Sequence, residues 1–527
     1  MNEHTRHWLL RLTALVFLVG CGSVTVTIAR HCSSNAVLGR YSIPAASALV
    51  LATAASAASL TIALLPKRSL SRFVAWLHEG FQSFQIPIPR GSCRDGIILV
   101  SLAVASYGVI GFRFIEANAA PRDDQLDYLN KAAEIRHMGG LPVLSRQLWD
   151  GSYEEEKVDA GNRHPLYTAL LSACPDFATA KGFSFSLGFL TLGLVWWNTV
   201  CRSGWLLGGV TAVLLATNSV FQQSASIVAC EMLLILLTVL VWFTIDRHRP
   251  ELKASGLPTE RPPTNAVDRR DASEPARSWF GGVWQNQIGL ALQSACVGGW
   301  LGLAYLTKAS AVFLLVGFLA WSLSVAGMRR WSWLAVVSFA VISSPLLVRN
   351  ARAFGDPLYS FNTRFLFADK FERDRPFRGT LTEARDYLSH HSAREILQRA
   401  ASGLAWEGFI FLGSLAPATL GDNSRPLAGT VIVLLALFGT IQTDRRLVLL
   451  AILWCASFFV FFAWYYPIAA DDRFLAPITP IVLLFAARGA TALIASKAPA
   501  TERVPRIVCY AAILWCVAAT VMSFKSP

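Results

Sequence analysis

Apolar stretches of about 20 residues recur along the whole sequence, and they constrain the fold more than any other feature. A stretch of that length with few charges is typical of an α-helix that crosses a membrane. Charged residues make up only 15% of the chain, against about 25% in soluble proteins, so a soluble enzyme is excluded. We predict an all-α, polytopic integral membrane protein with about 13 transmembrane helices. The predicted spans are residues 8–28, 42–65, 96–115, 182–200, 205–221, 227–245, 286–304, 309–327, 331–348, 427–441, 447–466, 474–494 and 507–523.

The basic residues set the predicted orientation of these spans. The net charge is +13, but Lys and Arg lie mostly in short loops, which is the bias of cytoplasmic loops, so nucleic acid is not an expected partner. The loop 66–95 carries five basic residues and should be cytoplasmic. The stretch 116–163, with ten acidic residues against six basic ones, then lies outside. The arginine-rich stretch 349–405 also falls outside, because long loops largely escape the rule.

This layout divides the chain into consecutive regions. They are two N-terminal helices with a cytoplasmic loop (1–95), a membrane core (96–348) with a first outer loop at 116–181 and a linker at 246–285, a second outer loop (349–426), and the C-terminal helices (427–527).

Several shorter segments need a separate interpretation. The linker 246–285 is rich in proline and charge, a composition typical of cytoplasmic disorder. Residues 404–420 are interrupted by Glu407 and glycines, so we predict an interfacial or re-entrant segment. Residues 18–21 resemble a lipoprotein cleavage site, but the apolar run continues past Cys21, which favours an uncleaved helix. The ten cysteines form no CxxC pair and lie mostly in apolar segments, so we expect them to be inert.

Ionisable residues near the membrane carry the most information, because burying a charge in lipid is costly. Glu231, inside a predicted span, should face protein and make a structural hydrogen bond. The others gather at the outer ends of the spans. They include Asp123, Asp124, Asp127, Tyr128, Arg163, His164, Lys308, Arg349, Asp471, Asp472 and Arg473. A carboxylate among fixed cations suits chemistry on an anionic lipid-linked substrate, since the carboxylate can accept a proton and the cations can stabilise a departing phosphate.

Several short motifs resemble a known family. The Asp-x-x-x-Tyr element at 124–128, the His-Pro-Leu-Tyr element at 164–167 and the two large outer loops resemble the GT-C glycosyltransferases. The nearest similarity is to the bacterial branch related to protein O-mannosyltransferases and aminoarabinose transferases. Residues 304–308, 355–359 and 473–477 are also similar to that branch, and the resemblance runs from about residue 96 to 495.

The resemblance implies a GT-C architecture and an inverting transfer of a sugar from a polyprenyl-phosphate carrier to a lipid, glycan or protein acceptor. It places the active site on the extracytoplasmic face of the inner (plasma) membrane. It assigns the general base to Asp124, with Asp123 as the alternative. Lys308 and Arg473 would hold the carrier phosphate, while Arg163 and His164 would border the donor or acceptor pocket. Further candidates for substrate binding are Asp127, Tyr128, Tyr359 and Asp472.

No cofactor follows from the sequence with certainty. His390 and His391 lack companion ligands at the spacing of a zinc site, and a divalent cation held by the aspartates stays open. Two other functions compete with sugar transfer. A transporter or flippase of lipid-linked sugars should place polar residues at mid-membrane, whereas most charges here lie at the outer face. An enzyme similar to O-antigen ligases or polymerases would share the lipid donor and depend on a large outer loop such as 349–405.

Overall fold

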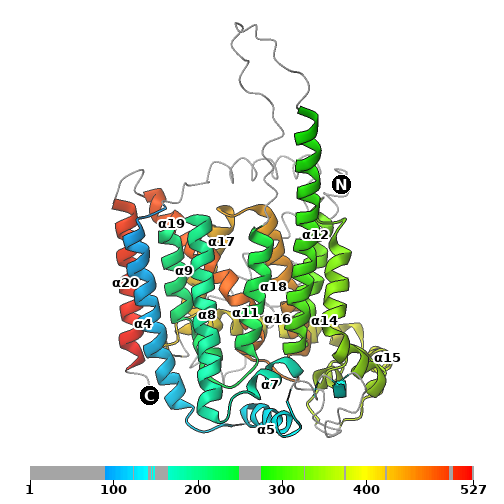
Figure 1. Ribbon diagram of the computed structural model, residues 1–527. Coiled ribbons are helices and arrows are strands. Elements are labelled where there is room, and N and C mark those ends of the chain that lie inside the picture. Colours follow the sequence, from blue (N-terminus) through cyan, green and yellow to red (C-terminus); the bar gives the residue numbers. More distant parts are fainter. Residues whose placement is uncertain are drawn as a thin grey trace.

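The computed structural model is built from helices, and within its described residues there is no β-strand (Figure 1). The all-α prediction is therefore confirmed for that part of the chain. The structure describes residues 90–122, 124–140, 144, 146–148, 164–247, 275–325, 327–372, 375–421, 424–497 and 503–524.

Seven described helices are long and apolar enough to cross a membrane. They are α4 (Cys93–Ala117), α8 (Phe177–Ser203), the Gln287–Thr307 part of α12 (Pro275–Thr307), α14 (Ser332–Phe354), α18 (Arg445–Tyr465), α19 (Thr479–Lys497) with the residues just before it, and α20 (Arg503–Ser523).

Four further predicted spans are shorter helices. They are α9 (Trp205–Thr217), α11 (Glu231–Arg247), α13 (Ala311–Ser324) and α17 (Arg425–Ile441), of 13, 17, 14 and 17 residues. A straight span takes about 20 residues, so the number of about 13 transmembrane helices is not confirmed. The predicted spans 8–28 and 42–65 lie outside the described residues.

The upright helices surround a buried centre. Nearly every residue of α9 is buried, and 78% of the apolar window of α19 is buried, as expected for helices that are apolar on all sides. Helix α9 packs against α4, α8, α19 and α20, and α19 packs against α17. Helices α4 and α20 lie at one edge of the bundle, and α12 and α14 lie near the opposite edge (Figure 1).

One end of the bundle, which we call the loop face, carries α5 (Asp124–His137), α7 (Pro165–Leu171) and α15 (Thr380–His390) (Figure 1). Helix α5 begins with the Asp-x-x-x-Tyr element at 124–128. It ends at Gly139 and Gly140, which have φ values of 103° and 79°. The Gly140 amide donates to the Ile135 carbonyl at 2.8 Å, a typical glycine termination of a helix.

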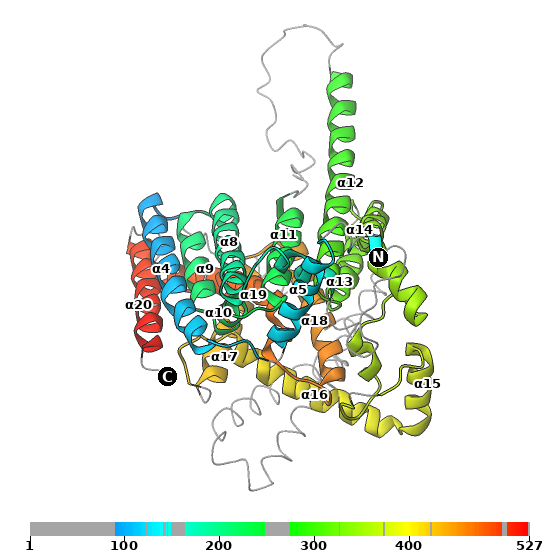
Figure 2. The same cartoon turned by 60° about the horizontal axis from the view of Figure 1, so that its bottom comes forward.

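The remaining described helices are shorter or lie across the bundle. They are α10 (Ser219–Ser226), α16 (Ala393–Ser414) and three 3-10 turns, η1 (Phe361–Phe365), η2 (Asp472–Phe474) and η3 (Ala476–Ile478). Helix α16 runs crosswise below the upright helices (Figure 2) and packs against α17 and α18. It contains most of the segment 404–420, and it is not among the helices apolar enough to span.

The predicted linker 246–285 needs a correction at its end. Helix α12 begins at Pro275, so residues 275–285 are helical rather than disordered. Proline is favoured at the first position of a helix, because its missing N–H has no partner there in any case. Figure 1 shows the start of α12 extending beyond the other helices, at the end opposite the loop face. Residues 248–274 lie outside the described residues.

Small residues allow α12 and α14 to approach closely. A Cβ atom at Gly298 would lie 2.1 Å from the carbonyl oxygen of Ala335, and one at Gly302 would lie 2.8 Å from Cβ of Ile342. Gly298 and Gly302 are four residues apart on one face of α12, the spacing by which membrane helices bring their backbones together. A Cβ at the neighbouring Gly299 would meet nothing within 4 Å.

We therefore expect Gly298→Ala to lower the free energy of unfolding by about 1–3 kcal/mol, because the added methyl group forces α12 and α14 apart. The matched variant Gly299→Ala should leave stability unchanged or raise it slightly, since alanine is the better helix former. Thermal unfolding of the purified protein in one detergent would measure both. Equal melting temperatures for the two variants would contradict this account of the interface.

Candidate active site

Arg473 lies at the centre of the ionisable residues on the loop face. It belongs to η2, the first of two 3-10 turns between α18 and α19. Its Nε atom is 2.9 Å from Oδ2 of Asp471, and its Nη1 atom is 3.1 Å from Oδ2 of Asp124. Asp471 also accepts the backbone N–H of Arg473 at 3.0 Å, which fixes the turn. One guanidinium thus bridges carboxylates from the start of α5 and from the residue that precedes η2.

The surroundings of Arg473 keep it charged. Burial alone would lower the pKa of Arg473, but the carboxylates of Glu231, Asp471 and Asp124 outweigh that effect and raise it. The side chains of Arg473 and Asp124 are 26% and 42% exposed, so the bridge is open on one side. Within the described residues, Arg473 Nη2 makes no hydrogen bond. A guanidinium with a free edge can take a phosphate oxygen.

A second ion pair lies beside this bridge. Lys308, in the turn between α12 and α13, places Nζ 2.7 Å from Oε1 of Glu231, the first residue of α11. The same Nζ atom is 5.5 Å from the ring centre of Phe474, which follows Arg473 in the chain. Glu231 is 5% exposed, so it faces protein. Its Oε2 atom is buried without a hydrogen bond in the described part of the chain.

The pKa values of three carboxyl groups in and beside the turn are shifted. Burial raises the pKa of Asp472 to about 7, helped by its hydrogen bond to Asp471. Burial also opposes ionisation of Asp471, but the hydrogen bond from Asp472 and the charge of Arg473 outweigh it and lower the pKa of Asp471. Glu407 of α16 is fully buried, and burial together with the charge of Asp471 raises its pKa to about 7. Neither oxygen of Glu407 has a hydrogen-bond partner among the described residues.

His164, at the N-terminus of α7, connects this helix to α12. It is 5% exposed, and its Nδ1 atom lies 2.5 Å from the carbonyl oxygen of Tyr305 in α12. A carbonyl can only accept, so Nδ1 carries the proton and donates. Burial, with the charges of Arg349 and Lys308, lowers the pKa of His164 to about 4 despite that hydrogen bond. The residue is therefore neutral at physiological pH and stands near the two ion pairs.

The other sequence-predicted residues are placed less centrally. Tyr128 is buried one turn after Asp124 and donates to Sγ of Cys230 at 3.0 Å. Asp127 is exposed on α5. Tyr359 is 3% exposed and stacks on Phe354 with ring centres 3.8 Å apart, so it packs against the end of α14. The two further predicted residues, Asp123 and Arg163, lie outside the described residues.

Two residues of this cluster, Asp471 and Glu407, have no role assigned from the sequence. Asp471 belongs to the charged group at the span ends, but sequence cannot show which of two adjacent aspartates turns toward Arg473. Glu407 carried a usable signal, since it is the single acidic residue in the apolar stretch 404–420. A buried acid in such a stretch is a functional-site candidate by the same reasoning that singles out Glu231.

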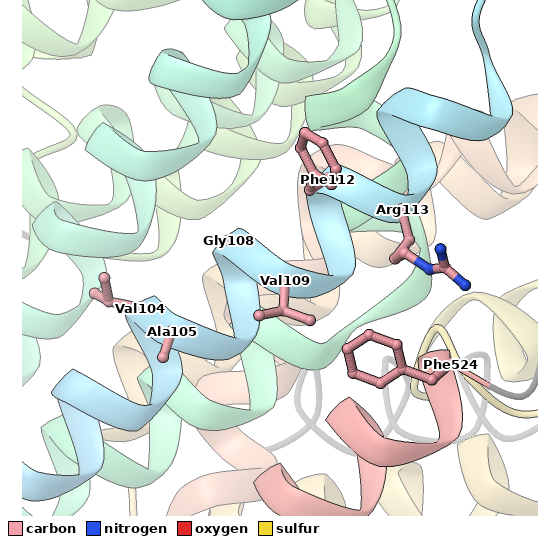
Figure 3. A pocket seen from close by; sticks show the side chains of 7 residues that line it. All are labelled: Val104, Ala105, Gly108, Val109, Phe112, Arg113 and Phe524. Atoms are coloured by element: carbon pink, nitrogen blue, oxygen red, sulfur yellow. The ribbon is translucent and has the colours of Figure 1, made fainter.

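The described residues offer no group of three or more His, Cys, Asp or Glu side chains that could hold a metal ion. The adjacent Asp123 lies outside them, so a divalent cation stays an untested prediction. A groove of about 560 Å³ lies elsewhere, along α4 and the end of α20 (Figure 3). Its lining is apolar apart from Arg113, whose guanidinium lies over the ring of Phe524. The groove lies at the edge of the bundle, and Arg473 does not line it.

Comparisons with known proteins give similarity to solved structures only. No family model matches the sequence, and no curated protein matches it. Among solved structures, the chain is similar to the archaeal oligosaccharyltransferase AglB from Archaeoglobus fulgidus, in complex with an inhibitory peptide and a dolichol-phosphate, with a TM-score of 0.41 and 12% sequence identity. The match covers 81% of this chain and 55% of that one, so the chain spans about half the length of that structure.

We expect Lys308→Met to lower the free energy of unfolding by about 3 kcal/mol or more, because it leaves the buried Glu231 carboxylate without its partner. The double variant Lys308→Met/Glu231→Gln should recover most of that loss. Thermal unfolding of the wild type, the single variants Lys308→Met and Glu231→Gln, and the double variant would measure the coupling between the two residues. If the two single effects simply add, the ion pair contributes nothing to stability and Lys308 is free for another role.

The raised pKa of Glu407 predicts a pH-dependent stability. Between its ordinary value of 4.5 and about 7, the folded protein holds a proton that the unfolded chain has lost. The stabilisation is therefore fully present below pH 4.5 and is lost as the pH rises through 7, with a slope of up to about 1.4 kcal/mol per pH unit. Glu407→Gln cannot ionise, so its melting temperature should vary less with pH and exceed that of the wild type at pH 8.

The matched control is Glu134→Gln, which removes an exposed carboxylate paired with Lys131 on α5. It should keep the wild-type pH profile. His164 acts in the opposite sense between about pH 4 and 6.5, because there the unfolded chain binds the proton. Only the difference between variants therefore isolates Glu407. Parallel profiles for the wild type and Glu407→Gln would show that folding does not raise the pKa of Glu407.

Proposed function

We propose that the protein is a membrane glycosyltransferase that moves a sugar from a polyprenyl-phosphate-linked donor to an acceptor. The bridge of Arg473 between Asp124 and Asp471 is the observation that supports this most strongly. It holds a carboxylate that can accept a proton within 3.1 Å of a cation that can bind phosphate. The sequence resemblance to GT-C enzymes assigns the same two residues, Asp124 and Arg473, to those tasks.

In the proposed reaction the acceptor hydroxyl attacks the anomeric carbon from the side opposite the phosphate. A bond forms between the acceptor oxygen and that carbon while the bond from carbon to phosphate oxygen breaks, so the configuration inverts. Asp124 takes the hydroxyl proton. The polyprenyl phosphate leaves with the bonding electron pair, and Arg473 stabilises the negative charge that grows on it.

The contacts of Arg473 support an order of events. In the free protein, Arg473 Nη1 is bound to Asp124 and Nε to Asp471. A phosphate that binds at the free Nη2 edge competes for the guanidinium and weakens its hold on Asp124. The carboxylate then becomes available to the acceptor hydroxyl only after the donor has bound. Lys308 would contact the same phosphate only by sharing its ammonium with Glu231.

The proposal also covers the side of the membrane on which the loop face lies and the acceptor that reaches it. The acidic stretch 116–163 favours an extracytoplasmic loop face by the distribution of basic residues. A lipid, glycan or protein acceptor would reach Asp124 from that side. The position of the ion pairs at helix ends, in η2 and in the turn after α12, favours transfer chemistry over a transport path through the bundle.

We expect Asp124→Asn to reduce turnover by about 10²- to 10⁴-fold, because asparagine cannot accept the proton. Arg473→Lys should reduce it by about 10- to 100-fold, since lysine keeps the charge but cannot bridge two carboxylates and a phosphate. The measurement is release of polyprenyl phosphate from a panel of lipid-linked sugars by purified protein in lipid nanodiscs.

An ion pair outside the cluster provides matched controls. Arg378 and Asp386 are 3.0 Å apart and 60% and 42% exposed. Arg378→Lys and Asp386→Asn make the same chemical changes and should leave turnover unchanged. Full turnover by Asp124→Asn would remove Asp124 from the mechanism. Transbilayer movement of the lipid without release of phosphate would favour the flippase instead.

A further inference from the structure

A second cavity, lined by polar and aromatic side chains, lies on the loop face between α15, α16 and the end of α18. Its volume is about 310 Å³, within the range of small-molecule sites. The side chains that line it combine carboxylates, an amide, a hydroxyl group and aromatic rings. They include Asp369, Tyr387, His391, Gln398, Arg399 and Tyr466. None of them belongs to the cluster around Arg473.

Asp369 is the fixed polar group of this cavity. Its Oδ2 atom is 3.1 Å from Nε2 of His391, and its Oδ1 atom is 3.4 Å from Nη1 of Arg399. These contacts hold the carboxylate in place, yet its side chain is 64% exposed. A carboxylate has about four acceptor positions, so both oxygens can still accept hydrogen bonds from a ligand.

Arg399 is a buried structural residue rather than an anion-binding residue. Its side chain is 6% exposed, and it donates from Nε to the Trp464 carbonyl at 3.0 Å and from Nη2 to the Leu366 carbonyl at 3.4 Å. The rings of Tyr387 and Trp464 lie 5.1 and 4.6 Å from its guanidinium carbon. Because each of its three nitrogens already donates one hydrogen bond and its side chain is buried, it is poorly placed to form a fork with a phosphate.

The aromatic part of the cavity is a stack. The rings of Tyr387 and His391 are 3.9 Å apart and nearly parallel, and both residues line the cavity. Tyr466 and Pro467 add apolar surface to the lining. Flat apolar faces beside acceptors and donors match a ligand that has C–H faces and many hydroxyl groups.

We propose that this cavity binds a sugar unit of a saccharide acceptor. The hydroxyl groups of the sugar donate to Asp369 and accept from Gln398, while a ring face packs on His391 or Tyr466. An anionic headgroup fits poorly, because the carboxylates Asp369 and Glu395 line the cavity and Arg399 is already engaged with Asp369. Saccharide binding stands on these contacts alone, whereas the acceptor role rests on the proposed glycosyl transfer.

The position of the cavity supports the acceptor role. Pro467 lines it, and Asp471 follows four residues later. Four residues of extended chain reach at most about 14 Å, so the cavity lies within a short oligosaccharide of the turn that holds Arg473. A saccharide held here by one unit could present the hydroxyl of another unit to Asp124.

The test measures binding of chitotriose, maltotriose and mannotriose to the full chain by saturation-transfer-difference NMR. Nanodiscs are used instead of maltoside detergent, whose headgroup would compete. At least one trisaccharide should bind the wild type at millimolar concentration. His391→Ala and Gln398→Ala should each weaken it about tenfold, the loss expected for one hydrogen bond or stacking contact. The matched variant His390→Ala changes the adjacent histidine, which does not line the cavity, and should bind as the wild type does.

Failure to bind any trisaccharide would overturn the proposal, as would equal binding by His390→Ala, His391→Ala and Gln398→Ala. Inorganic phosphate and trilysine serve as competing probes, and saturable binding of either in place of the sugars would reassign the cavity to an anion or a basic peptide. Asp124→Asn should still bind the saccharide. Saccharide binding together with unimpaired polyprenyl phosphate release by Asp124→Asn would therefore contradict the proposed mechanism and leave the cavity assigned.

Discussion

A charge buried in a membrane protein must be offset by a partner, because isolated ions in a low-dielectric interior are too costly to keep. Arg473 meets that requirement across a long sequence distance, since its bond to Asp124 joins residues 349 positions apart. The bond attaches α5 to η2. Without it α5 would lose this polar connection to the C-terminal part of the chain, and the Asp124 carboxylate would no longer be held beside the cation.

The position of that bridge depends on how the helices below it pack. Helices α9 and α19 fill the centre of the bundle, and small residues let neighbouring backbones touch, as at Gly439 and Gly489, where an added Cβ would lie 1.9 and 1.8 Å from carbonyl oxygens of the facing helix. Such contacts leave little freedom for α17 and α19 to slide. The turn η2 is therefore carried by a rigid element, which suits a residue that must hold two carboxylates at hydrogen-bond distance.

The sequence predicted the helices well and the site in part, for a physical reason. Apolar runs report burial in lipid directly, so every predicted span in the described chain is a helix, although α9 and α13 are too short to confirm the number of crossings. Asp124 and Arg473 were both singled out, because charged residues at span ends are conspicuous. Their direct contact was not predictable, and neither was the pairing of Lys308 with Glu231, because tertiary packing of distant helices decides both.

The acid groups around η2 bear on how an anionic substrate could enter such a site. If Asp124, Glu231, Glu407, Asp471 and Asp472 were all ionised, five negative charges would face the three positive charges of Lys308, Arg473 and Arg425, the last of which acts on Asp472. Below pH 7, where the raised pKa values of Asp472 and Glu407 keep both protonated, three negative charges face three positive ones. A phosphate then approaches Arg473 against much less repulsion, and competition for the guanidinium need not expel a buried charge into an unpaired state. Burial of these two carboxyl groups thus keeps the cluster close to neutral, which is the condition under which an arginine already bound to carboxylates can still accept a phosphate.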